Sequence, residues 1–256
     1  SATDVESPEL NFSASSDTLA VIVSVLGDQL TMAPATDWNG TANVTVTVSD
    51  GFLTDEETFV LTVNPVNDAP TIELPESFTF EEDGSLDEDF SSYMDDIDED
   101  LLTLTVSDTV NITVSIDGFE VTFGANEHWN GTDTLTFTVN DNRGRLVATD
   151  EIAIIVTPVN DAPVLSEIGN QGTDEDTSPP AIDLSLFASD VDENTALTFS
   201  ASSDTNAVTV SVDEYALLTM TPLENFNGFA KITVTVSDGF LTDTTDFELT
   251  VIAVND

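Results

Sequence analysis

The sequence predicts an all-β protein built as a tandem array of Greek-key β-sandwiches, and three observations lead to this fold class. The phrase Val-Asn-Asp-Ala-Pro occupies residues 66–70 and 159–163, and its first three residues return at 254–256, which spaces its aspartates 93 and 95 residues apart. Apolar and polar residues alternate with a period of two in many short stretches. Turn-forming residues separate those stretches at regular intervals.

The repeated phrase divides the chain into like domains. We expect an incomplete repeat followed by two full ones, with the boundaries 1–68, 69–161 and 162–256. The landmark Asp4-Val5-Glu6 aligns with 96–98 and 190–192, so about two of the strands that open a repeat are missing before it. Because missing strands leave unpaired sheet edges, we expect further residues upstream of Ser1 or a neighbouring chain that supplies them.

Within each repeat, an apolar residue alternates with a polar one that is usually threonine. In a strand this spacing turns the apolar side chains toward a core and the threonines toward water. We expect strands at 43–48, 102–106, 110–116, 119–123, 135–139, 232–236 and 247–251. A full repeat of about seven such strands is typical of an immunoglobulin-like sandwich.

A turn recurs before the long strand of each repeat, at Asn39-Gly40, Asn130-Gly131 and Asn227-Gly228. Asn-Gly suits the positive φ of a tight reversal. Each turn follows an aromatic residue, namely Trp38, Trp129 or Phe226. Stacking on sugar rings is one interpretation of these aromatic side chains. Their recurrence at one position of every repeat favours a role in closing the core.

The chain is strongly acidic, with 50 Asp and Glu residues against 3 Lys and Arg residues and a formal charge of −47. Phosphate binding requires basic groups, so this composition excludes nucleic acid and anionic membrane surfaces as partners. Like-charge repulsion opposes compaction, and bound divalent cations or a salty environment would relieve it. The sequence has no cysteine, which excludes a thiolate metal site, and no apolar stretch as long as a membrane span.

Four acidic landmarks recur in a fixed order. A cluster near the start of a repeat (81–83 or 174–176) precedes an Asp-x-Asp pair, an aspartate after the penultimate strand, and the Asn-Asp-Ala-Pro phrase. In this ordered set the whole chain resembles the cadherin-like tandem repeats of large bacterial surface adhesins.

The resemblance implies that calcium binds at the joints between successive repeats. Carried over by position, the ligands of the first joint are Asn67, Asp68, Asp96, Asp98 and Asp141. Those of the second joint are Glu82, Asn160, Asp161, Asp190, Asp192 and Asp238. Positions that carry ligands in animal cadherins hold Pro65, Pro158, Ala69 and Ala162 here, so we expect one or two ions at each joint.

The chemistry of these residues supports calcium independently of the family. Calcium takes six to eight oxygen ligands, which carboxylates and amide carbonyls supply. Carboxylates held close together repel one another or take up protons unless a cation lies between them. Solvated loop charge is the alternative interpretation of the Asp-x-Asp pairs. An EF-hand loop at 95–100 is disfavoured because the glycine, the closing glutamate and the flanking helices are missing.

The sequence shows no constellation of nucleophile and base, so the chain is predicted not to be an enzyme. His128, the one histidine, is expected to be a surface or turn residue. The predicted function is a calcium-rigidified structural spacer of an extracellular adhesin stalk or cell-surface filament.

Its expected partners are neighbouring repeats, like chains in a fibre, and a glycan or surface ligand. A carbohydrate-binding module array of a secreted protein is the alternative function. A third possibility keeps the fold and assigns the acidity to halophilic solvation.

Overall fold

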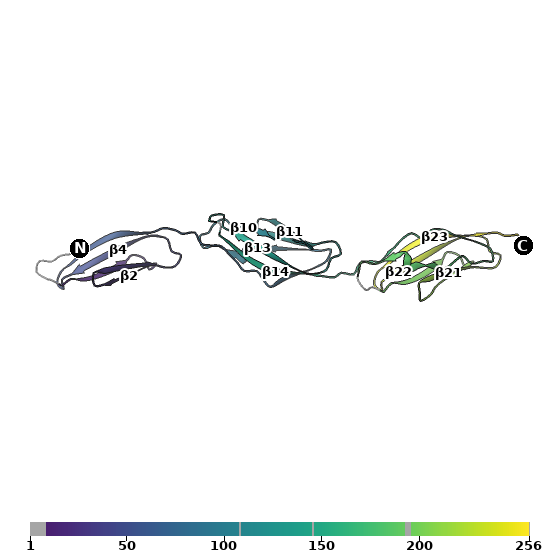
Figure 1. Ribbon diagram of the computed structural model, residues 1–256, viewed down its shortest axis with the longest axis horizontal. Coiled ribbons are helices and arrows are strands. Elements are labelled where there is room, and N and C mark those ends of the chain that lie inside the picture. Colours follow the sequence, from purple (N-terminus) through teal and green to yellow (C-terminus); the bar gives the residue numbers. More distant parts are fainter. Residues whose placement is uncertain (1–8, 108, 145, 193–195, 256) are drawn as a thin grey trace. The chain divides into compact units, whose positions relative to one another are not determined.

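The computed structural model describes residues 9–107, 109–144, 146–192 and 196–255, in which strands predominate (Figure 1). The landmark at 4–6 and Asp256 lie outside these residues. The chain divides into two compact units, one formed by 1–78, 86–123 and 133–154 and the other by 79–85, 124–132 and 155–256. Over the described ranges, no helix is long and apolar enough to cross a membrane.

The first stretch of strands lies in the first unit. Its strands are β1 (Asn11–Ser16), β2 (Val21–Leu26), β3 (Gln29–Pro34), β4 (Gly40–Ser49) and β5 (Thr54–Val63). Strands β1, β4 and β5 form one sheet in that order, and β2 pairs with β3 in a second. The side chains of Val21, Ala42 and Val44 are buried between them. Among the described residues, β5 is an edge strand, and the side chain of Val60 on it is exposed.

The middle stretch contains two larger sheets. Its strands are β6 (Thr71–Ile72), β7 (Ser77–Glu81), β8 (Ser85–Asp89), β9 (Met94–Asp95), β10 (Thr103–Val106), β11 (Ile112–Asp117), β12 (Glu120–Ala125), β13 (Gly131–Asn140) and β14 (Val147–Thr157). The sheet orders are β10-β13-β14-β7 and β11-β12-β8, with β6 paired to β9. A short 3-10 helix, η1 (Phe90–Tyr93), connects β8 and β9, and the Asp89 side chain caps it by accepting from the Ser91 N–H.

Aromatic rings fill the core of the middle stretch. Phe90 lies at the centre of this cluster, with its ring centroid 4.7 Å from that of Phe137 and 6.2 Å from those of Phe78 and Phe123. The Phe90, Phe123 and Phe137 side chains are fully buried. Aromatic pairs at such separations contribute beyond the area that they bury.

The last stretch lies in the second unit and repeats the arrangement. Its elements are β15 (Val164–Leu165), β16 (Gln171–Asp174), β17 (Ile182–Asp183), η2 (Leu184–Leu186), β18 (Ala188–Ser189), β19 (Thr198–Ser203), β20 (Val208–Val212), β21 (Leu217–Pro222), β22 (Gly228–Ser237) and β23 (Thr242–Ile252). The sheet orders are β16-β23-β22-β19 and β17-β21-β20, with β15 paired to β18. Strand β16 runs parallel to β23, while β22 and β23 pair antiparallel over their whole length.

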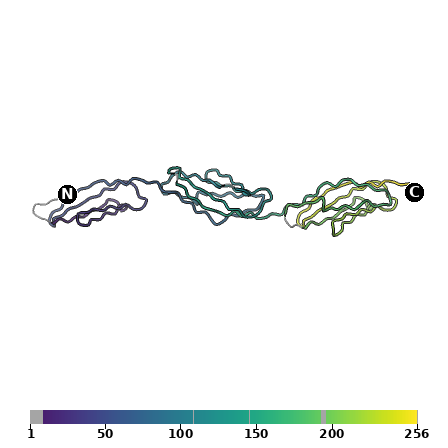
Figure 2. The backbone as a smooth tube through the Cα atoms, in the orientation of Figure 1, coloured from purple at the N-terminus to yellow at the C-terminus, as the bar shows by residue number. Residues whose placement is uncertain are grey.

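These sheets confirm the all-β, immunoglobulin-like fold class predicted from the sequence. The alternation along β22 buries Ile232, Val234 and Val236, and the equivalent alternation along β13 buries Leu135, Phe137 and Val139. Figure 2 traces the backbone of the same strands. Two expected strands begin later than predicted: β10 begins at Thr103, and β11 begins at Ile112 and leaves Val110 exposed.

The aromatic residue before each Asn-Gly turn packs back onto the glycine that follows. A Cβ atom added to Gly131 would lie 3.0 Å from Trp129 Cζ2, and one added to Gly40 would lie 3.3 Å from Trp38 Cζ2. Both glycines have a positive φ, of 147° and 140°. The ring therefore occupies the space of a side chain at a position that only glycine adopts without strain, which supports a packing role for these rings.

We expect Phe90→Ala to lower the free energy of unfolding of the middle stretch by about 3–5 kcal/mol, because it leaves a cavity among aromatic rings. Urea unfolding followed by Trp129 fluorescence, in a Trp38→Phe background, measures this loss. Phe240→Ala is the matched control, since the Phe240 side chain is 85% exposed and its removal should change stability little. Equal losses in the two variants would contradict the assignment of Phe90 to the centre of the core.

Candidate metal centres at the two joints

Each joint brings its Asn-Asp pair together with three aspartates from later loops. At the first joint, which lies within the first unit, these are Asp96 and Asp98 after β9 and Asp141 after β13. At the second joint, within the second unit, they are Asp190, Asp192 and Asp238. All of these predicted ligands belong to the hydrogen-bonded networks described next, and Glu82, the remaining predicted ligand, is described after them.

A chain of hydrogen bonds links the carboxylates of the first joint. The Asn67 side-chain amide donates to Asp141 Oδ2 (2.6 Å) and to the Asp68 carbonyl (3.0 Å). The Asp68 N–H donates to Asp98 Oδ2 (2.7 Å), and the Asp98 N–H donates to Asp96 Oδ1 (2.9 Å). Asp141 and Asp96 are buried, at 1% and 9% exposure. The backbone of the joint is therefore tied to two loops of the repeat that follows it.

The second joint has the same network. The Asn160 amide donates to Asp238 Oδ2 (2.7 Å) and to the Asp161 carbonyl (2.9 Å). The Asp161 N–H donates to Asp192 Oδ2 (2.8 Å), and the Asp192 N–H donates to Asp190 Oδ1 (2.9 Å). The bond to Asn160 is the main reason that the pKa of Asp238 lies below its usual range. The second joint therefore repeats the hydrogen-bonded arrangement of the first with a separate set of residues.

Two carboxylate oxygens in these networks have no hydrogen-bond partner. Among the described residues, the buried side-chain atoms in this state are Asp96 Oδ2 and Asp190 Oδ2, which occupy the same position in the two joints. A buried carboxylate oxygen without a donor is costly unless a cation takes it up. The other members of each network are carboxylates and a side-chain amide, whose oxygens are ligands that calcium takes. The residues present therefore fit a hard divalent cation.

Asp100 is a member of the first joint that sequence reasoning missed. Ligand oxygens of Asp96, Asp98 and Asp100 all lie within 4.8 Å of one another. Asp100 Oδ1 also accepts from Arg143 Nε at 2.9 Å. Among the described residues of the first joint, Asp100 is the carboxylate that pairs with a basic side chain.

Glu82 and its counterpart Glu175 accept hydrogen bonds from the backbone just after the last strand of a repeat. Glu82 is buried, and its Oε1 accepts from the Val159 N–H at 2.7 Å, while Oε2 accepts from the Asn130 amide at 3.1 Å. Glu175 Oε1 accepts from the Val254 N–H at 2.6 Å in the same way. Both Glu82 oxygens are therefore engaged close to the second joint, beside residues 159–161.

Asp37 is a second residue of the first joint that was not foreseen. It precedes Trp38 in the turn before β4, and its negative charge acts on Asp68. The pKa of Asp68 lies above its usual range because of its burial and, next, because of the charges on Asp37, Asp98 and Asp96. Burial and the neighbouring negative charges both disfavour the ionised form of this carboxyl group.

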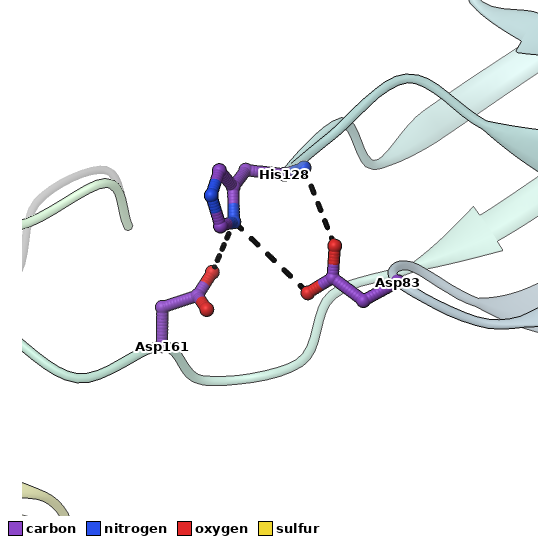
Figure 3. Close-up of side chains that lie close together, drawn as sticks. All are labelled: Asp83, His128 and Asp161. Atoms are coloured by element: carbon purple, nitrogen blue, oxygen red, sulfur yellow. Dashed lines mark hydrogen bonds and ion pairs between the residues drawn. The ribbon is translucent and has the colours of Figure 1, made fainter.

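At the second joint the equivalent turn position holds His128, which contacts the joint. Its Nδ1 lies 2.8 Å from Asp161 Oδ2 and 4.0 Å from Asp83 Oδ2 (Figure 3). The hydrogen bond to Asp161 raises the pKa of His128. His128 is a turn residue with a partly exposed side chain, as expected, but the contact with Asp161 was not predicted. The signal was present in the sequence, since Asp37 and His128 both directly precede the Trp-Asn-Gly turn.

The sequence matches a family model described as bacterial Ig domain twice, over residues 67–157 and 160–250. A comparison with curated proteins finds no match. Together the two copies span well over half of the chain.

Solved structures of similar fold include cadherin repeats. The protocadherin gamma B2 extracellular cadherin domains 1–5 match 97% of this chain and 53% of that chain, with 16% identity and a TM-score of 0.62. Human CDH23 EC21–23 matches 94% of this chain and 88% of that chain, with 15% identity and a TM-score of 0.56. At these identities the likeness shows the fold alone.

An endo-fucoidan hydrolase of glycoside hydrolase family 107 also matches 97% of this chain, with 18% identity, but its TM-score of 0.36 is too low to bear on function. This chain spans 39% of that enzyme. It therefore covers less than two thirds of the length of this hydrolase and of the protocadherin gamma B2 chain.

We expect Asp37→Asn to lower the pKa of Asp68 in cation-free solution, because a neighbouring negative charge is removed. The pKa should stay above its usual range, since burial remains. Carboxyl-carbon NMR titration of Asp68 measures both values. Asp28→Asn, a change in the exposed β2–β3 turn, is the control and should leave Asp68 unaffected. An Asp68 pKa that does not respond to Asp37→Asn would show that the two side chains do not interact.

Proposed function

This chain belongs to the family of bacterial Ig domains, and we propose that it serves as a calcium-rigidified spacer in an extracellular adhesin stalk or cell-surface filament, with calcium bound at each joint. In this role the chain is a structural element and not an enzyme. Its partners would be neighbouring repeats, together with like chains of a fibre and a glycan or surface ligand contacted by the full-length protein.

One observation carries the proposal. Asp96 Oδ2 and Asp190 Oδ2 are buried oxygens without a donor, and they sit at the same place in two networks separated along the sequence. A missing hydrogen-bond donor caused by the local conformation of one loop would not be expected to recur at the same position of both repeats. A cation bound at both places accounts for the pair.

The residues that would hold calcium follow from the two networks. At the first joint they are the carboxylates of Asp68, Asp96, Asp98, Asp100 and Asp141. At the second joint they are those of Asp161, Asp190, Asp192 and Asp238. When bound, calcium would supply two positive charges and accept these oxygens as ligands. Asn67 and Asn160 position the late aspartate through their amide groups.

Rigidification follows from the attachments of the joint backbone. Residues 159–161 are held at one end by Glu82, which accepts from Val159, and at the other by Asp192, which accepts from Asp161. The second attachment depends on a carboxylate that its like-charged neighbours repel. A cation between those carboxylates would remove the repulsion and strengthen the attachment, which restricts bending at the joint.

An extracellular location agrees with this chemistry. Extracellular modules bind calcium at about 10⁻⁴–10⁻³ M, a concentration range present outside cells. The packing of Trp38 and Trp129 onto Gly40 and Gly131 supports the spacer over a glycan-binding array, because these rings have a structural role in each repeat.

We expect calcium to raise the melting temperature of the chain, and Asp96→Asn to remove most of the increase contributed by the first joint. At ten times the dissociation constant, one site adds about 1.4 kcal/mol to the free energy of unfolding. Differential scanning calorimetry with and without calcium measures the effect.

The control is Asp50→Asn. Asp50 caps the β4–β5 turn by accepting from the N–H groups of Phe52 and Leu53, as Asp238 does from Phe240 and Leu241, but no joint residue donates to it among the described residues. This variant should lose some stability and keep the full calcium response. A calcium response that survives Asp96→Asn undiminished would refute the first-joint site.

Chelation of calcium should change the dimensions of the chain in solution. Small-angle X-ray scattering is expected to show a larger spread of end-to-end distances in chelator than in calcium, because the joints bend freely when the carboxylates repel one another. Magnesium and concentrated sodium chloride serve as controls. An equal response to all three conditions would favour the halophilic interpretation and contradict specific calcium sites.

A further inference from the structure

We propose that Asp83, His128 and Asp161 form a second kind of metal site, which binds a transition-metal dication of the zinc class. The three side chains come from three segments, namely the turn after β7, the turn before β13 and the second joint. One ligand atom from each lies within 4.8 Å of the others. Figure 3 shows the imidazole directed toward both carboxylates.

The observed distances suit such an ion. Zinc bonds of about 2.0–2.2 Å in tetrahedral geometry place neighbouring ligand atoms about 3.4 Å apart. The distances from His128 Nδ1 are 2.8 Å to Asp161 Oδ2 and 4.0 Å to Asp83 Oδ2, one below and one above this spacing. Small rotations of exposed or partly exposed side chains would equalise them.

A carboxylate also lies near the other ring nitrogen of His128. Metal-bound imidazoles commonly donate their second N–H to a carboxylate, which fixes the ring and makes the bound nitrogen a better ligand. His128 Nε2 lies 3.6 Å from Glu127 Oε1, slightly beyond hydrogen-bond distance, and a small rotation of the exposed Glu127 side chain would bring the two atoms within it. The ring is thus placed between a carboxylate at Nε2 and two carboxylates at Nδ1. A neutral imidazole with oxygen ligands favours zinc, nickel or copper over calcium.

Comparison of the repeats shows that the turn at position 128 does not require a histidine. Asp37, His128 and Asn225 occupy the same position and have φ values of 58°, 55° and 57°. In the last repeat, the Asn225 N–H donates to Asp176 Oδ1 at 2.8 Å, which is the counterpart of the His128 contact with Asp83. The turn therefore forms without an imidazole, and His128 adds a nitrogen ligand at one joint alone.

The inference is separable from the calcium proposal, although both use Asp161. Asp161 Oδ2 lies beside His128, whereas the backbone N–H of Asp161 donates to Asp192, one of the proposed calcium ligands. A transition metal at His128 requires neither Asp190 nor Asp238. An ion pair between His128 and Asp161 without any metal is the competing explanation of the geometry, and the experiment must distinguish the two.

The test uses zinc added to the chain in the presence of excess calcium, which saturates sites that prefer oxygen ligands. Because the chain has one histidine, its two side-chain ¹⁵N resonances report on a single residue. We expect zinc to shift the Nδ1 resonance and to saturate near one equivalent. Asp83→Asn should weaken zinc binding at least about ten-fold, and His128→Asn should abolish this binding phase in calorimetry.

The matched control is Asp176→Asn, which changes the equivalent aspartate beside Asn225 and should leave zinc binding unchanged. His128→Asn is expected to fold, because asparagine holds the same backbone conformation at position 225. An Nδ1 resonance that zinc does not move, or equal weakening by Asp83→Asn and Asp176→Asn, would overturn the site. The calcium response of the first joint, measured in His128→Asn, shows separately whether the calcium proposal stands.

Discussion

Mutual repulsion among carboxylates that cannot move apart is the constraint around which both joints are built. Two unit charges 4 Å apart interact by about 1 kcal/mol in water and about 4 kcal/mol near a protein surface. The chain has few basic residues with which to offset this repulsion. Instead, backbone N–H groups compensate individual oxygens, as Asp68 does for Asp98 and Asp98 does for Asp96. Each network ends on a buried carboxylate oxygen, of Asp96 or Asp190, without a hydrogen-bond donor, and the proposed cation would compensate this oxygen.

The joints include aspartates that also stabilise turns within the sandwiches. Asp50 and Asp238 both cap the turn after a long strand through Oδ1, which accepts from two backbone N–H groups. That bond leaves Oδ2 available. Where an asparagine of a joint lies nearby, as Asn160 does, Oδ2 becomes part of the network. A turn-capping aspartate thus becomes a site residue through the phrase that precedes its repeat, with no change in the turn itself.

Features of the joints differ in how far they could be predicted from the sequence. Period-two alternation located β13 and β22, because burial on one face of a strand leaves a local signal. The repeated phrase and the Asp-x-Asp pairs identified residues that the structure joins in one network at each joint, since loops at one end of a sandwich lie close together. Asp37 and His128 were not foreseen, because their contacts depend on a left-handed turn that aims one side chain at the joint. Asp100 was hidden within an acidic run in which no member stands out.

The left-handed turn presents a different side chain beside each joint on the same backbone. Asn, Asp and His are enriched several-fold among non-glycine residues with positive φ. These are the residues found at positions 37, 128 and 225, and they are also three residues with metal-binding side chains. The backbone therefore admits a short set of side chains that offer a carboxylate, an imidazole or an amide to the joint. Because Asp83 and Asp176 accept from the backbone N–H of this residue and not from its side chain, we expect exchange within this set to preserve the turn. If the joints bind cations as proposed, single substitutions at this one turn position would change the ligand set of one joint without altering the others.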